Sequence, residues 1–137
     1  MANTVNNTRV LIGRKKVVQY VTIHSDGSEE TDLVIYDSSA VATALGITDT
    51  LKCSIEFLTY STNSLAGIVE IEFDATTDVL AWACPAYSGA SEFNFTQYGG
   101  LPNYAGTGVT GDITLTTTGL AIGDAITLVI VIDPNIP

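Results

Sequence analysis

The chain has 137 residues, of which 46% are hydrophobic and 15% are charged, a composition typical of one folded domain with a core. Its 15 acidic and five basic side chains give a formal net charge of −10, which disfavours binding to the phosphate backbone of nucleic acids. The start of the chain has no apolar segment of the kind found in secretory signals. The longest apolar run, residues 125–132, is far shorter than the roughly 20 residues of a membrane-spanning helix. We therefore expect neither nucleic acid nor a membrane among its partners.

The first 16 residues contain four of the five basic side chains, which are Arg9, Arg14, Lys15 and Lys16. Residues 53–137 contain nine acids and neither Lys nor Arg. Because the start, MANTVNNT, is too polar to bury much apolar surface, we predict an amino-terminal arm over residues 1–16 and a β-sandwich domain over residues 17–137. The arm would bind an acidic surface, for example that of another copy of the chain. The alternative is that the four bases keep the edge of a strand soluble.

Alternation of apolar and polar residues, with many β-branched side chains, predicts strands in eight segments of the chain. These segments are KVVQYVTIHS, TDLVIYD, TLKCSIEFLTY, GIVEIEFD, DVLAWAC, SEFNFTQY, DITLTTT and DAITLVIVID. One short helix is the most that we expect, in DSSAVATALGITD, where Ser38 or Ser39 would cap the helix and Gly46 would end it. The predicted fold is all-β, a single antiparallel β-sandwich of about eight strands that resembles a jelly roll.

The alternation also assigns side chains to faces. It places Ile55 and Phe57 together on one face of a strand, and Leu80, Trp82 and Cys84 together on one face of another. We expect both of these faces to be buried.

Three acids, Glu70, Glu72 and Asp74, fall on the outward face of one strand, with successive members about 7 Å apart. That spacing is too wide for two of them to share one cation closely. The simpler interpretation is a solvated acidic face, or one that receives the basic residues of a neighbouring copy, so no metal and no cofactor is predicted. The alternative is a Ca²⁺ site to which Asp78 in the following turn adds an oxygen.

Residues 106–111, GTGVTG, match the G-x-G-x-x-G spacing that binds dinucleotides. That motif needs a helix after it, whose amino terminus faces the pyrophosphate, and here a predicted strand follows instead. We therefore expect Gly106, Gly108 and Gly111 to permit unusual backbone angles in a loop.

The residues that commonly carry catalysis are sparse. His24, beside Ser25 and Asp26, is the one histidine. Adjacent residues of a strand point to opposite faces, whereas a catalytic triad needs convergence. Cys53 and Cys84 are expected to be buried free thiols, with a disulfide between them as the alternative. No catalytic residue is predicted and the protein is not expected to be an enzyme.

Four stretches resemble a family of small virion proteins of tailed bacteriophages that decorate, or cement, the capsid. They are VVQYVTIHSDGSEETDLVIYD, EIEFDATTDVLAWACP, GGLPNYAGTGVTGDITLTTTG and DAITLVIVI, and together they span roughly Val17 to Ile132. The resemblance implies a non-enzymatic structural role on the outer surface of a phage capsid. It also implies the major capsid protein as a partner and self-association, preferably as a trimer. Another position in the virion, such as a head fibre, tail or connector, is an alternative.

A second class of function stays open. A carbohydrate-binding or adhesin module would present exposed aromatic side chains to a sugar, and the candidates are Trp82, Tyr87, Tyr98 and Tyr104. The expected burial of Trp82 weighs against this alternative.

Overall fold

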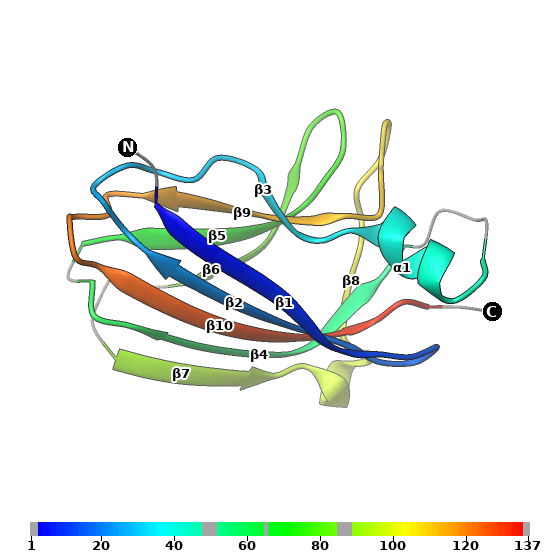
Figure 1. Cartoon of the computed structure of the whole chain (residues 1–137). Coiled ribbons are helices and arrows are strands. Elements are labelled where there is room, and N and C mark those ends of the chain that lie inside the picture. The colour runs from blue at the N-terminus through cyan, green and yellow to red at the C-terminus, as the bar shows by residue number, and fades with distance from the viewer. Residues whose placement is uncertain (1–2, 48–51, 65, 85–88, 136–137) are drawn as a thin grey trace.

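The computed structural model describes residues 3–47, 52–64, 66–84 and 89–135. In these residues two antiparallel sheets lie face to face as the layers of a sandwich, and one short helix lies at an end of it (Figure 1). The predicted all-β sandwich with one short helix is confirmed.

The larger sheet has the strand order β1-β2-β10-β4-β7, with β8 paired to β4, and the smaller sheet has the order β3-β9-β5-β6. The strands of the larger sheet are β1 (Thr4–Ile12), β2 (Val17–His24), β4 (Ser54–Thr62), β7 (Gly89–Asn94), β8 (Leu101–Pro102) and β10 (Ala125–Asp133). The strands of the smaller sheet are β3 (Leu33–Tyr36), β5 (Ile68–Phe73), β6 (Val79–Cys84) and β9 (Ile113–Thr118). The helical elements are α1 (Ser38–Ala44) and the single 3₁₀ turn η1 (Thr96–Tyr98).

The order of the strands is that of a jelly roll. When β1 and the two-residue β8 are set aside, the eight remaining strands are the eight that alternation predicts. If these eight strands are renumbered from 1 to 8 along the chain, the larger sheet has the order 1-8-3-6 and the smaller sheet has the order 2-7-4-5. Chain neighbours thus mostly alternate between the two sheets, as in a double Greek key.

The core lies between the sheets and consists of alternate residues of the central strands. On β10 and β5 these buried side chains are Ile126, Leu128, Ile130, Ile132, Val69, Ile71 and Phe73. Full burial of such a side chain contributes about 1.5–3 kcal/mol relative to exposure, so the two facing stripes hold the layers together.

The predicted arm is wrong for most of its length, because residues 4–12 form β1, which pairs with β2 at the edge of the larger sheet. Side chains of this segment also bond to the chain that follows β2, at Ser28 in a loop and at Ile35 in β3 of the other sheet. Asn3 Nδ2 donates to the Ser28 carbonyl at 3.1 Å, and Asn7 Nδ2 donates to the Ile35 carbonyl at 3.1 Å. The segment is therefore part of the sandwich, since polar side chains can close the gap between two sheet edges by hydrogen bonding.

Two of the predicted faces are also wrong, in both cases because of an extra residue in a strand. Ile55 and Phe57 oppose consecutive residues of β10, so Leu58 takes the inward place that Phe57 was predicted to have. Trp82 and Leu80 likewise oppose consecutive residues of β5, and Leu80 is 52% exposed on the outer face. A bulge shifts the alternation by one position and so exchanges the faces of all residues beyond it.

The helix α1 lies where it was predicted, but its cap is Asp37, and neither Ser38 nor Ser39. The Asp37 carboxylate accepts a hydrogen bond from the backbone of the first turn. At the other end Gly46 has a φ of 72°, the left-handed conformation that glycine adopts most easily where a helix stops. The predicted end of the helix is confirmed.

Candidate interaction surfaces

The outer face of the larger sheet carries apolar side chains at positions where a sandwich usually presents polar ones. Val18 of β2 lies opposite Leu11 of β1 and opposite Val131 of β10. Val131 in turn lies opposite Phe57 of β4. Leu11, Val18, Val131 and Phe57 thus form an apolar row across four strands, because directly opposed residues point to the same face.

A second row runs beside the first. Tyr20 of β2 lies opposite Val129 of β10, with Thr8 of β1 and Thr59 of β4 on either side. Leu11 is 49% exposed and Tyr20 is 40% exposed, so both rows are open to solvent. We call the two rows the apolar face, and Glu92 of β7 borders it.

The apolar face was not predicted, although the sequence carries a signal for it. Residues 125–132, AITLVIVI, are apolar at nearly every position and not at every second position. A strand of this kind has apolar side chains on both of its faces, so its outer face needs a cover as well as its inner face.

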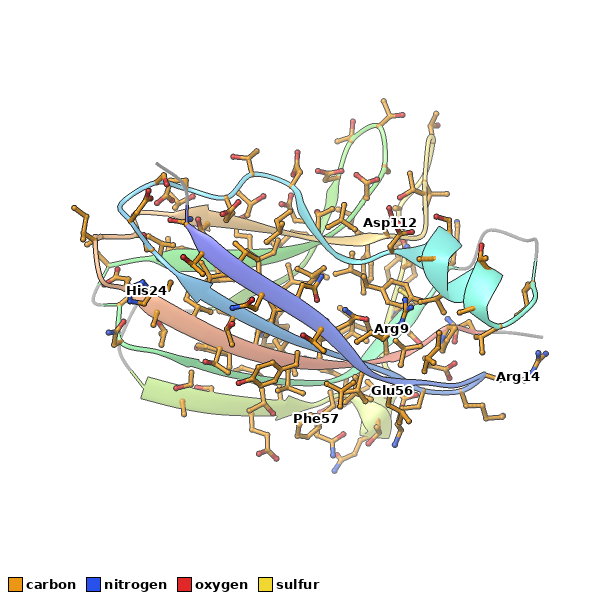
Figure 2. The ribbon with its side chains drawn as sticks, in the orientation of Figure 1. Arg9, Arg14, His24, Glu56, Phe57 and Asp112 are labelled. Carbon is orange, nitrogen blue, oxygen red and sulfur yellow. The ribbon has the colours of Figure 1, made fainter. Side chains whose placement is uncertain are left out.

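The four basic residues do not form one group. Arg14, Lys15 and Lys16 are exposed at the turn between β1 and β2, and Figure 2 shows Arg14 at the tip of this hairpin. Arg9 instead lies opposite Gln19, whose side chain is buried, and therefore points to the inner side of β1. The basic hairpin tip, residues 14–16, adjoins the end of the apolar face at Leu11.

The outer face of the smaller sheet combines acids and threonines with exposed apolar side chains, which are Val34, Ile68 and Leu80. Glu70 and Glu72 of β5 lie opposite Thr116 and Thr114 of β9, and both acids point outward as predicted. Asp74, the third predicted member, is held apart from them, since its carboxylate accepts a hydrogen bond of 2.7 Å from the Thr110 hydroxyl.

A different set of three acids comes closest together on this face. Carboxylate oxygens of Asp32, Glu72 and Asp78 all lie within 4.8 Å of one another. Burial, and then the negative charges of Asp78, Asp32 and Glu70, raise the pKa of Glu72 above its ordinary value. Asp32 was not predicted, because it lies 40 positions before Glu72 and no local pattern connects them.

The glycine motif lies in a loop that leads into a strand, as predicted. Gly108 and Gly111 have φ angles of 77° and 86°, whereas Gly106 has no positive φ, so the predicted unusual angle is wrong at that position. The loop lies beside the turn at residues 74–78 (Figure 1). The Thr76 amide donates to the Thr107 carbonyl at 3.1 Å. A Cβ at Gly108 would lie 3.0 Å from the Thr76 nitrogen, so the absence of a side chain there permits a close approach of two loops.

The aromatic candidates for sugar binding are in different environments. Tyr98 at the end of η1 is 80% exposed and Tyr104 is 79% exposed. Trp82 is half-buried, and its ring lies 4.8 Å from that of Phe93 and 5.0 Å from that of Phe95. Tyr87 is outside the described residues.

The candidates for thiol chemistry are both buried. Cys53 and Cys84 are free thiols, as expected, and burial raises the pKa of each to about 12. Neither thiol is therefore ionised near neutral pH, which makes both inert. His24 is exposed at the end of β2, at the opposite end of the sheet from Arg14 (Figure 2).

Comparisons with known proteins leave the family open. No protein-family model and no curated protein matches the chain. A variant of a family 29 carbohydrate-binding module has a TM-score of 0.41 at 7% identity, over 96% of this chain and 73% of its own. A conserved protein from Klebsiella pneumoniae with a double-stranded β-helix domain has a TM-score of 0.33 at 9% identity, over 98% of this chain and 79% of its own. At such TM-scores neither similarity assigns a ligand or an activity to this chain.

The described part of the chain contains no helix with the length and apolar character needed to cross a bilayer.

Proposed function

We propose that this protein is a non-enzymatic structural protein of a bacteriophage virion, where it decorates and stabilises the capsid from its outer surface. Its partners in this proposal are the major capsid protein and other copies of itself, in a trimer. The proposal rests on the resemblance of residues 17–132 to capsid decoration proteins. The observation that carries it in the structure is the apolar face.

The apolar face suits a protein partner better than a small polar ligand. Exposed apolar surface that is contiguous and bordered by polar residues is typical of protein–protein contacts. The face spans four strands and is open at Leu11 and Tyr20, so it offers area for a specific contact, which needs about 1,000 Å² or more in total. The basic hairpin tip beside it would add attraction to an acidic rim of the partner.

The test compares a variant of the apolar face with a control variant elsewhere on the surface, at Leu80 of the smaller sheet and at Tyr98 of η1. Leu11→Ser with Tyr20→Ser removes two exposed side chains of the apolar face, and Leu80→Ser with Tyr98→Ser is the control elsewhere. Leu11 and Leu80 are matched in exposure, at 49% and 52%. Particles that lack the protein would be mixed with each variant and sedimented.

We expect the Leu11/Tyr20 variant to bind the particles at least tenfold more weakly, which corresponds to about 1.4 kcal/mol, with its melting temperature nearly unchanged. The control variant should bind as the unaltered protein does. Equal binding by both variants, or no binding of the unaltered protein to its own particle, would contradict the proposal. An image of the particle by cryo-electron microscopy would separate the capsid surface from a head fibre, tail or connector.

Carbohydrate binding is a second candidate, which the high exposure of Tyr98 and Tyr104 favours. Aromatic rings that project from loops offer flat apolar surfaces to the faces of sugar rings. A glycan array, followed by affinity electrophoresis in gels that contain the best ligand, tests this candidate. Retardation that Tyr98→Ala and Tyr104→Ala abolish, and that Leu11→Ser leaves unchanged, would favour it over capsid decoration.

A further inference from the structure

We propose that Asp32, Glu72 and Asp78 form a Ca²⁺ site on the outer face of the smaller sheet. Three carboxylates supply hard oxygen ligands, the type that Ca²⁺ prefers. Each comes from a different part of the chain, and the pairing of β3, β9, β5 and β6 brings them together.

The spacing of the oxygens matches Ca²⁺ in size. Ca²⁺ lies about 2.3–2.6 Å from its oxygen ligands, so two ligands on opposite sides of the ion are up to about 5.2 Å apart. The three carboxylate oxygens lie within 4.8 Å of one another, inside this limit. Mg²⁺ demands a near-ideal octahedral set of ligands at about 2.0–2.1 Å and gives up its waters reluctantly, so three carboxylates on a sheet surface suit Ca²⁺ better.

The residues around the carboxylates hold two of them in place. Asp78 Oδ1 accepts a hydrogen bond of 3.1 Å from the Ala75 amide, which orients the Asp78 side chain in the turn before β6. The Asp32 amide donates to the Thr116 hydroxyl at 3.1 Å, which fixes the backbone of Asp32 beside β9. A ligand set held in this way loses little freedom when an ion binds.

A buried hydroxyl next to the cluster points independently to a ligand. Thr114 of β9 lies directly opposite Glu72, so the two side chains share the outer face of the sheet. Although it faces outward, Thr114 is only 1% exposed, and its hydroxyl has no hydrogen-bond partner among the residues that the structure describes. Buried hydroxyls are normally paired, and an ion held by the neighbouring carboxylates would give this oxygen a favourable contact.

The charge around the site also favours a cation. Residues 53–137 contain no Lys or Arg, so this part of the chain supplies no positive side chain to Glu72 and Asp78. The three negative charges repel one another, as the raised pKa of Glu72 reflects in part. A divalent ion would replace this repulsion by attraction.

Calcium binding can be measured by isothermal titration calorimetry with CaCl₂ and by the melting temperature in EDTA and in Ca²⁺. We expect one Ca²⁺ per chain, a melting temperature several degrees higher in saturating Ca²⁺, and a much smaller effect of Mg²⁺. Glu72→Gln and Asp78→Asn should each weaken Ca²⁺ binding at least tenfold. Glu70→Gln, on the same strand and the same face, is the matched control and should bind as the unaltered chain does.

The melting temperatures of the same variants in EDTA distinguish loss of the Ca²⁺ site from loss of the fold. Because removal of one negative charge relieves repulsion, Glu72→Gln and Asp78→Asn should melt in EDTA at or above the temperature of the unaltered protein. Thr114→Val, which keeps the shape of the side chain, should weaken binding without lowering the melting temperature in EDTA. The absence of heat and of a melting shift up to about 10 mM Ca²⁺, above the range of weak protein sites, would overturn the proposal. So would equal losses in Glu72→Gln and Glu70→Gln.

Discussion

Asp37 is the N-cap of α1, and its carboxylate has two hydrogen-bond partners there. Asp37 Oδ1 accepts hydrogen bonds from the Ser39 hydroxyl at 2.7 Å and from the Ala40 amide at 3.1 Å. These bonds stabilise the ionised carboxylate and hold the pKa of Asp37 below its ordinary value of 3.8. A side chain whose pKa falls on folding stabilises the fold in its ionised form.

We expect Asp37→Ala to lower the free energy of unfolding by about 1 kcal/mol at pH 7, the usual loss for an N-cap. The contribution of the charge is present above the unfolded pKa of 3.8 and is lost as the pH falls through the lower folded pKa. The difference between Asp37→Ala and the unaltered protein should therefore shrink below pH 4 in urea titrations followed by circular dichroism. Asp37→Asn, which caps without titrating, is the control, and its stability relative to Asp37→Ala should not depend on pH. A pH-independent difference between Asp37→Ala and the unaltered protein would contradict this account.

At the scale of the element, β1 closes one open side of the sandwich. Its inward side chain Asn7 lies between the two sheets, donates to the Val34 and Ile35 carbonyls of β3, and accepts from Gln19 Nε2 at 2.8 Å. Gln19 of β2 is only 5% exposed, so its amide depends on this partner. The edge strand is thus fastened by side chains as well as by its ladder to β2.

We expect Asn7→Ala to lower the free energy of unfolding by about 1–3 kcal/mol, because it leaves the buried amide of Gln19 without its acceptor. The neighbouring Asn6, which lies opposite Thr22 and points outward, offers a matched control. Asn6→Ala should change the stability by less than about 0.5 kcal/mol, as is usual for surface positions. Urea denaturation of both variants measures the difference, and equal effects would show that β1 is held by its backbone ladder alone.

At the scale of the whole molecule, the two outer faces of the sandwich differ in charge and polarity. The larger sheet presents the apolar face with the basic hairpin tip, and the smaller sheet presents the acids of β5 beside threonines and the exposed Val34 and Leu80. We expect such a domain to bind its partner through the apolar face and to leave the acids of β5 in solvent. The basic hairpin tip is then placed to steer and strengthen this contact.

Replacement of Arg14, Lys15 and Lys16 by Gln should weaken binding to the virion particle, more at low than at high salt, because salt screens exposed charges. Each exposed charge contributes only about 0–1 kcal/mol to the binding free energy. The loss of binding free energy should therefore be modest for one copy and larger for a trimer. The melting temperature should stay nearly unchanged, since all three side chains are exposed at a turn. Sedimentation with particles at several salt concentrations measures the effect. If the substitutions leave particle binding unchanged, the hairpin tip is not part of the contact.

Trimer formation in solution is expected on the same proposal. Size-exclusion chromatography with light scattering should give three times the protomer mass of 14.4 kDa. A monomer at all concentrations, which also fails to associate on the particle, would contradict self-association.

The sequence alone determined the main strands and the inward face of β5. In β5 the buried side chains alternate with acids, and this pattern is local, so it is readable without knowledge of the partner strands. The end of α1 at Gly46 was predictable for the same reason. The residue that follows a helix often adopts the left-handed conformation, and glycine adopts it most easily, so the position of the glycine alone indicates where the helix stops.

Only the tertiary structure decided the features that depend on strands far apart in the chain. The extra residues that turn Phe57 and Leu80 outward exist only relative to the strands they pair with, so no period in a single segment reveals them. The polar segment at residues 4–12 is a strand because it pairs with β2, packs Val5 and Ile12 against the core, and donates from Asn7 to carbonyls of the opposite sheet. Asp32 likewise meets Glu72 through the pairing of β3 and β5 with β9. Local periodicity specifies which residues seek the core, whereas the contacts between strands decide which polar and charged groups meet outside it.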